Sequence, residues 1–404
     1  MASHDTHFDD AALLQRPRAE LSALGNRSMM LGGLGAVLMA IGFFAARDTF
    51  MQSYLIAYIF WTGITVGSLA VLMVHHLSGG AWGMVGRRVW EAGAKNVPLM
   101  AILFLPIAFS LPELYVWARP EAASDPIIHE KAAYLNPKFF YIRAALYFGI
   151  WSALTWILTK WSRQQDENPT LLPGPQDRRF RLVSAPGLCL WVLTITFMSV
   201  DWVMSLDPHW YSTIFGVLTL GGQGLSTLAF TIIVLASLVK FAPMSKVATA
   251  ENFHDLAKLM FAFTMLWAYF SVSQLLIIWS ANLPEEIPFY LERLHGPWYP
   301  ISVLLLLGQF ALPFLLLLSR SLKRTPSKVR LVALFILAMR VVDIAWTIGP
   351  VFRHEGSSLH WLDFASVLGL GLLWLALFWR NLAGRPLVPA HDPYFKEAMA
   401  HGGH

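Results

Sequence analysis

Cysteine is almost absent from this chain, which has one, Cys189, among its 404 residues. A single thiol cannot form an intrachain disulfide or hold a four-cysteine iron–sulfur cluster, and the C-x-x-C-H spacing that attaches a c-type haem is missing. Any covalently bound redox centre that works with this protein must therefore belong to another chain. Phosphate-binding loops, catalytic triads and metal-ligand spacings are also missing from the sequence.

Charged residues are scarce as well. They make up 14% of the chain, against about 25% in an ordinary soluble domain, while hydrophobic residues reach 56% and the mean hydropathy is +0.52. This composition excludes an ordinary soluble enzyme and predicts an all-α polytopic membrane protein. The formal net charge of +5 does not indicate nucleic-acid binding, because the basic residues lie in short segments at the ends of apolar runs, where they set topology.

The apolar residues are gathered into runs long enough to cross a hydrocarbon core about 30 Å thick. Loop residues separate them into ten predicted spans, at 28–45, 54–76, 97–117, 140–161, 184–206, 213–240, 257–280, 298–319, 328–351 and 360–382. Of the 30 Lys and Arg residues, 22 fall on the side of the two termini and 7 on the opposite side, which we call the outer side. This asymmetry predicts that both termini are cytoplasmic. The first 27 residues lack the layout of a cleavable signal, so we expect the N-terminus to be retained.

Spans 2 to 5 resemble spans 6 to 9 weakly. Span 5 begins with an Arg-Leu-Val triplet at Arg181 and later carries Asp201, while span 9 begins with the same triplet at Arg330 and later carries Asp343. An internal repeat of four spans predicts two four-helix bundles with two flanking helices. The predicted division is a cytoplasmic segment 1–27, flanking helix 28–53, first bundle 54–206, second bundle 207–351, flanking helix 352–382 and cytoplasmic tail 383–404.

Ionisable residues inside the spans mark the candidate functional region. Asp201 lies more than one helical turn inside the corner between spans 5 and 6, and Arg340 and Asp343 are three residues apart, on one helix face. A charge at such depth costs about 2.5 to 3.5 kcal/mol on insertion scales, so these side chains should face the protein interior. With Glu113 and Gln274, which fall in the same outer halves of their spans, they form the candidate proton path. The alternative is that these groups pair for purely structural reasons.

The two carboxylates are expected to differ in role. Asp201 has no cation on its own helix face, so we expect it to be the better proton carrier, whereas Asp343 is expected to pair with Arg340 as a gate. We expect one polar, partly hydrated path to contain all three.

The cytoplasmic end of span 2 carries His75 and His76. Adjacent helical residues point about 100° apart, so the pair cannot ligate one haem together. They are candidates for titratable groups on the cytoplasmic side, or for histidines that only form interfacial hydrogen bonds.

Three segments carry a resemblance to a known family: the corner 201–216, the segment 76–83 and the run 267–274. They resemble the ActF-type subunits of bacterial alternative complex III, which are NrfD-like (polysulfide-reductase-type) membrane proteins, and the resemblance extends from span 1 to span 10. It implies a multi-pass subunit of a quinol:cytochrome c (or other electron acceptor) oxidoreductase in the bacterial cytoplasmic (inner) membrane, within a respiratory or photosynthetic electron transport chain.

The resemblance also implies the partners. They are a paralogous NrfD-like subunit (ActC), which is the quinol binder of the family, multihaem and monohaem cytochrome c subunits, an iron–sulfur protein, small membrane subunits and, in some complexes, a terminal oxidase. Haem c and iron–sulfur clusters would reside in those partners, and quinol or menaquinol is the only cofactor considered for this chain itself. Three alternatives stay open: a proton-conducting or quinone-interacting subunit, a non-catalytic scaffold, and a secondary transporter with a midplane substrate site.

Overall fold

The computed structural model describes residues 18–167, 178–353, 359–389, 391, 392 and 395. Ten helical segments within this part of the chain are long and apolar enough to cross a membrane, which confirms the prediction of an all-α polytopic membrane protein. The ten spans consist of α2 (Arg18–Ala45), α3 (Arg47–Ser78), α4 to α6 (Arg87–Ala94, Val97–Leu103, Leu105–Phe109), α9 (Pro137–Glu167), α10 with η5 (Arg178–Trp202, Met204–Leu206), α11 (Phe215–Leu238), α13 (Ala250–Ala281), η6 to α16 (η6 Gly296–Trp298, α15 Tyr299–Leu304, the π-helical η7 Leu305–Ala311, α16 Leu312–Leu318), α18 with η8 (Pro326–Ile348, Gly349–Val351) and α19 (Trp361–Ala383). Short helices connect them: η1 (Ala81–Gly83), α7 (Leu111–Leu114), η2 (Val116–Ala118), η3 (Pro120–Ser124), α8 (Pro126–Lys131), α12 (Met244–Val247), α14 (Pro288–Leu294) and α17 (Arg320–Lys323).

The first and third spans differ most from their predicted boundaries. The third span starts at Arg87 and ends at Phe109, whereas we expected 97–117. Sequence reasoning started the span after the charged residues Arg87, Arg88 and Glu91. These side chains are buried and hydrogen-bonded to Ser162 and Arg385, which belong to other segments, so the span can contain them. Prolines at the first positions of α5, α6 and α7 then break the helix, because proline cannot donate the next backbone hydrogen bond. The first span was also placed too late, since α2 begins at Arg18 rather than at residue 28.

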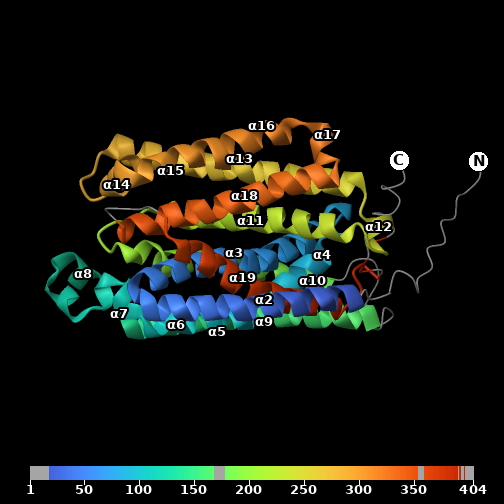
Figure 1. Ribbon diagram of the computed structural model, residues 1–404, viewed down its shortest axis with the longest axis horizontal. Coiled ribbons are helices and arrows are strands. Elements are labelled where there is room, and N and C mark those ends of the chain that lie inside the picture. Colours follow the sequence, from blue (N-terminus) through green and yellow to red (C-terminus); the bar gives the residue numbers. More distant parts are fainter. Residues whose placement is uncertain (1–17, 168–177, 354–358, 390, 393–394, 396–404) are drawn as a thin grey trace, which may run out of the picture.

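Helix α3 is the centre of the molecule (Figure 1). It packs against α2, α4, α10, α11, α18 and α19, and almost all of its side chains from Phe50 to Met73 are buried. A side chain at Gly67 would overlap the Thr227 hydroxyl, so glycine lets α3 and α11 approach closely. Two tryptophans tie α3 to the last span: Trp61 Nε1 donates to the Val367 carbonyl at 2.9 Å, and Trp374 Nε1 donates to Thr65 Oγ1 at 2.8 Å.

The predicted flanking helices pack against each other, and both contact α3. At their crossing, a Cβ on Gly35 would lie 2.7 Å from the Cα of Gly369, so backbone meets backbone there. Helices α13, α15 and α16 form the opposite edge of the molecule, beyond α18 and α11, as Figure 1 shows.

The two ends of the molecule differ. We call the end where α2 begins and α19 ends the terminal end, and the opposite end, with α7, α8 and α14, the far end (Figure 1). The basic asymmetry predicts that the terminal end is cytoplasmic and the far end is the outer side.

A loop packs onto the corner between α10 and α11 at the far end. Lys131 Nζ donates to the Pro208 carbonyl at 2.6 Å, and His209 Nε2 lies 2.8 Å from Asp125 Oδ2. Asp125 also caps α8 by accepting from the N–H groups of Ile127 and Ile128. Desolvation raises the pKa of the Asp125 carboxyl, but the hydrogen bonds from His209 and the two backbone N–H groups outweigh it, so this pKa is lower than usual.

Candidate functional site

Asp201 is the most completely paired of the candidate residues. Its side chain is 1% exposed and accepts two hydrogen bonds from Arg143 of α9, each 2.9 Å long, and a third from the Tyr147 hydroxyl at 2.6 Å. The Arg143 guanidinium stacks on the Tyr134 ring and donates to the Tyr134 carbonyl at 3.0 Å. The bidentate contact fixes α9 and the loop before it onto α10.

This arrangement changes the role expected of Asp201. The cation that is missing from its own helix comes from a different helix, 58 residues earlier in the chain. Protonation of the carboxylate would leave the Arg143 guanidinium without the counter-charge that Asp201 supplies. The geometry therefore describes a structural brace better than a proton carrier.

Arg340 and Asp343 form an ion pair on one face of α18, as their spacing predicts. Trp267 Nε1 of α13 donates to Asp343 Oδ2 at 3.2 Å, and Arg340 Nε donates to Ser226 Oγ at 3.4 Å. Gly222 is required beside the guanidinium, because any side chain there would overlap Arg340. The pair thus joins three helices, α11, α13 and α18, in the second half of the chain.

The Arg340–Asp343 pair lines a cavity of about 700 Å³, which we call the second-bundle cavity. Its walls come from α11, α13, α15, η7 and α18, with contributions from α3, α10 and α14, and they are mostly apolar. Asp201 is not among the lining residues. The structure therefore separates the two candidate carboxylates: Asp343 faces the cavity, and Asp201 lies in the brace with Arg143.

Gln274 and Gln223 also line the second-bundle cavity. Their side chains are 3% and 5% exposed, and the Oε1 atom of each has no hydrogen-bond partner. Because a buried amide oxygen without a partner is costly, these two atoms are available to a donor that enters the cavity. Gln274 was a predicted site residue, and the structure brings it together with Arg340 and Asp343.

The far end of the second-bundle cavity is covered by α14, which contributes Phe289 and Tyr290. Arg293 holds this helix in place by donating to the carbonyls of Phe289 at 2.7 Å, Trp346 at 3.1 Å and Thr347 at 2.7 Å. Trp346 and Thr347 belong to the last turn of α18, where a cation is favoured by the helix dipole. Burial lowers the pKa of Arg293, and Glu292 opposes this shift.

Glu113 lies apart from the other candidates. It belongs to α7, beyond the third span, and its carboxylate pairs with Arg47 at 2.6 Å, with 30% of its side chain exposed. The structure thus gives it a partner at the surface of the far end rather than a place beside Asp201 or Asp343.

His75 and His76 point in different directions at the terminal end. His75 is 2% exposed, with Nε2 at 3.9 Å from Asp392 Oδ2, and its ring packs near Trp82 and Trp90. The ring of His76 stacks on Phe180 with centroids 4.4 Å apart. His75 therefore belongs to a buried charged cluster, and His76 packs against α10.

Sequence reasoning missed this charged cluster at the terminal end. At its centre, Glu91 of α4 accepts from Arg87 Nε at 3.1 Å, Arg88 Nη1 at 2.8 Å, Arg385 Nη1 at 2.6 Å and Ser162 Oγ at 2.6 Å. All of these side chains are buried. The four-residue spacing of Arg87 and Glu91 was visible in the sequence, but the charges were read as part of the loop between the second and third spans.

The same cluster anchors the segment after α19, described at 384–389, 391, 392 and 395, which we call the tail strap. Arg87 Nη1 donates to Asp392 Oδ2 at 2.6 Å, Gln165 Nε2 donates to the His391 carbonyl at 3.0 Å, and Arg385 Nη2 donates to the Thr159 carbonyl at 2.7 Å. Burial lowers the pKa of Arg385, opposed by Glu91. The predicted tail 383–404 thus begins as a packed element, and its remaining residues lie outside the described part.

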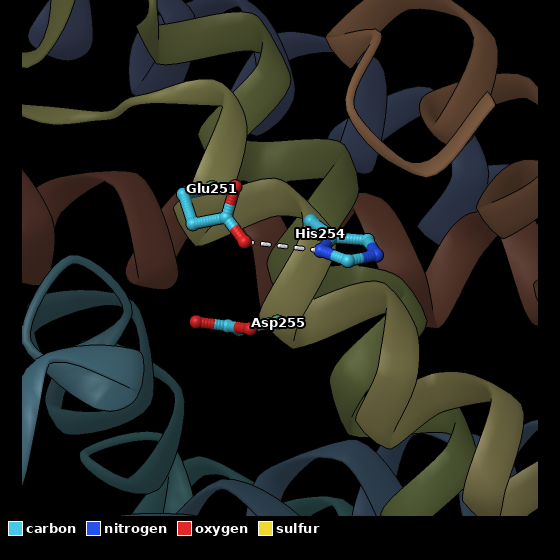
Figure 2. A group of neighbouring side chains, drawn as sticks. All are labelled: Glu251, His254 and Asp255. Carbon is cyan, nitrogen blue, oxygen red and sulfur yellow. Dashed lines mark hydrogen bonds and ion pairs between the residues drawn. The ribbon is translucent and has the colours of Figure 1, made fainter. Parts of the chain in front are cut away.

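Figure 2 shows a further group at the start of α13, where Glu251, His254 and Asp255 bring their ligand atoms within 4.8 Å of one another. Glu251 Oε1 lies 3.2 Å from His254 Nδ1, and its other oxygen pairs with Arg324 at 3.1 Å. Asp255 pairs with Lys258 at 3.1 Å. Cations of the chain already balance both carboxylates, so the group is explained as an ion-pair network at the terminal end.

Comparison of the sequence with models of known protein families and with curated proteins finds no match.

Proposed function

We propose that this protein is an integral membrane subunit of a quinol:electron acceptor oxidoreductase complex, as its resemblance to the ActF-type subunits implies, and that it contributes a proton path. The observation that carries the proposal is the Arg340–Asp343 ion pair in the wall of the second-bundle cavity. A charged pair inside a membrane helix is costly, so a pair that borders a cavity is a functional candidate.

Asp343 is the residue we assign to proton exchange, in place of Asp201. Asp343 accepts from Arg340 and Trp267, is 8% exposed and lines the cavity, whereas Asp201 is 1% exposed and held by three hydrogen bonds from Arg143 and Tyr147. Proton exchange needs a hydroxyl or a water within hydrogen-bond reach of the carboxylate. The cavity offers Asp343 that access, with Arg340 as its ion-pair partner between transfers.

Electron-carrying groups are assigned to partner chains. Cys189 is a lone, exposed thiol, and His75 and His76 lie in different packing environments. In the part of the chain that the structure describes, these residues do not form a ligand set for a cluster or a haem. This chain would therefore act on protons and on a lipid-soluble substrate, and its partners on electrons.

The test is to purify the full-length tagged protein from its native membranes in mild detergent. We expect c-type haem absorbance in the purified complex, together with quinol-driven reduction of cytochrome c. In that complex, Asp343→Asn should lower the protons released per electron. Asp201→Asn should lower the amount of assembled complex while leaving the proton yield of the assembled fraction unchanged.

Two results would contradict the proposal. One is a purified protein without redox partners or quinol oxidation, and the other is an unchanged rate and proton yield in Asp343→Asn. A secondary transporter is the second candidate, because the eighth span is interrupted by the π-helical η7 beside the cavity, and interrupted helices line transporter sites. Solute uptake by the purified chain in liposomes would favour that alternative.

A further inference from the structure

We propose that the second-bundle cavity binds a neutral amphiphile whose compact head carries hydroxyl or carbonyl oxygens. The head would lie between Gln274 and the Arg340–Asp343 pair, and the apolar tail would leave toward the lipid between α13 and η7. This inference rests on the cavity itself and does not depend on the redox assignment above.

The size of the cavity favours a small molecule. Its volume of about 700 Å³ falls within the range of about 300 to 1,000 Å³ that is typical of ligand pockets. The cavity therefore has the volume of a site for one small amphiphile.

The polar groups of the wall favour an uncharged head. Arg340 and Asp343 neutralise each other, so a charged head would enter an apolar site without a counter-charge. The unpartnered Oε1 atoms of Gln274 and Gln223 can accept hydrogen bonds from the ligand. Arg340 adds a donor in the same wall, so a hydroxyl of the ligand would find both kinds of partner and a carbonyl oxygen would find a donor.

In the first half of the chain, the space beside the corresponding carboxylate, that of Asp201, is filled by side chains. The residue after Asp201 is Trp202, whose ring is fully buried and contacts the rings of Phe104, Phe148 and Trp151 at centroid distances of 4.7, 5.7 and 6.2 Å. The residue after Asp343 is Ile344, which lines the cavity. Aromatic side chains therefore fill the space beside one carboxylate, while the space beside the other stays open.

The lipid-facing side of the cavity is bordered by α13 and by η7, with Leu305, Leu306 and Phe310 on the η7 side. A π-helix interrupts the regular hydrogen-bond ladder of an α-helix and is frequent at functional sites. The eighth span is therefore irregular at the depth where the tail of a ligand would pass.

The experiment uses the full-length protein in nanodiscs of one fixed phospholipid. Two radiolabelled probes are titrated separately: a short-tailed naphthoquinone and dioleoylglycerol. We expect saturable binding of at least one of them above empty nanodiscs. Naphthoquinone binding would identify a redox carrier as the source of the ligand, and binding of dioleoylglycerol alone would identify a structural lipid.

The variants locate the site. Ala268→Trp places a large side chain in the cavity, whereas Ala262→Trp is a matched control on an exposed face of α13 outside the cavity lining. We expect binding to be lost in the first and kept in the second. Gln274→Leu should raise the Kd about tenfold, as loss of a buried hydrogen bond to the head group does.

Two results would overturn the proposal. One is the absence of saturable binding for both probes, which would also be the outcome if another protein occupied the cavity. The other is an unchanged Kd in both Ala268→Trp and Gln274→Leu. If Ala268→Trp fails to fold by its melting temperature, Gln274→Leu decides alone. The two proposals fail in different experiments. If the protein purifies without redox partners but still binds the probes, the proposed function is wrong and the binding site stands.

Discussion

The buried ion pair between Arg143 and Asp201 gives the most quantitative prediction. Its burial specifies the cost of each single substitution and the coupling energy between the two residues. We consider Asp201→Asn, Arg143→Met and the double variant. Asp201→Asn keeps the shape of the side chain and removes the charge that Arg143 and Tyr147 hold at 2.9 Å and 2.6 Å. Each single variant leaves one charge in a buried place without its partner.

The expected magnitude follows from burial. Removal of one partner from a buried ion pair costs about 3 to 5 kcal/mol. Asp201 is 1% exposed, but 15% of the Arg143 side chain reaches the surface, where water screens the charge and moves the cost to the lower end, near 3 kcal/mol. The double variant loses both charges together. It should be no less stable than the worse single variant, which corresponds to a coupling energy of about 3 kcal/mol.

The assay is a double-mutant cycle on the free energy of unfolding in mixed detergent micelles. The control cycle uses Arg163 and Glu167, which also pair at 2.9 Å but have side chains that are 72% and 53% exposed. We expect no measurable coupling in that control. A coupling energy of less than about 0.5 kcal/mol for Arg143 and Asp201 would place the brace among ordinary surface pairs and refute the reasoning.

Three further predictions follow from single contacts. Gly35→Leu should destabilise the protein by about 1 to 3 kcal/mol or more, because the new side chain would overlap the backbone of Gly369. The control is Gly33→Leu, which has no atom within 4 Å of its Cβ and should be nearly neutral in thermal melting. Asp392→Asn should cost about 3 kcal/mol, since it breaks a buried ion pair, and protease cleavage of the tail strap should become faster. The pKa of Asp125 is lower than its ordinary value of 3.8, so its contact with His209 contributes stability that is complete above that value and is lost as the pH falls below it. Proteolysis of the far-end loop, followed down to about pH 3, should show the loosening, and Asp125→Asn should remove the pH dependence.

Several properties of the protein could be predicted from the sequence because each depends only on the residues of one segment of the chain. The number of spans follows from the length and polarity of each run, which the bilayer selects independently of the other helices. The Arg340–Asp343 pair was also predictable, because residues three apart on one helix are neighbours in any helical structure.

The partners of the other charged residues were decided only by tertiary structure. Asp201 obtains its cation from α9, 58 residues away, and Arg87 pairs with Asp392 across 305 residues. No periodicity in one helix specifies which face of another helix will meet it. Sequence reasoning therefore found no cation for Asp201 on its own helix face and started the third span after its charges. The second-bundle cavity has the same origin. Its walls come from helices spread over most of the chain. Trp202 fills the space beside Asp201, whereas the space beside Asp343 is open. This difference depends on how the side chains of all those helices pack together.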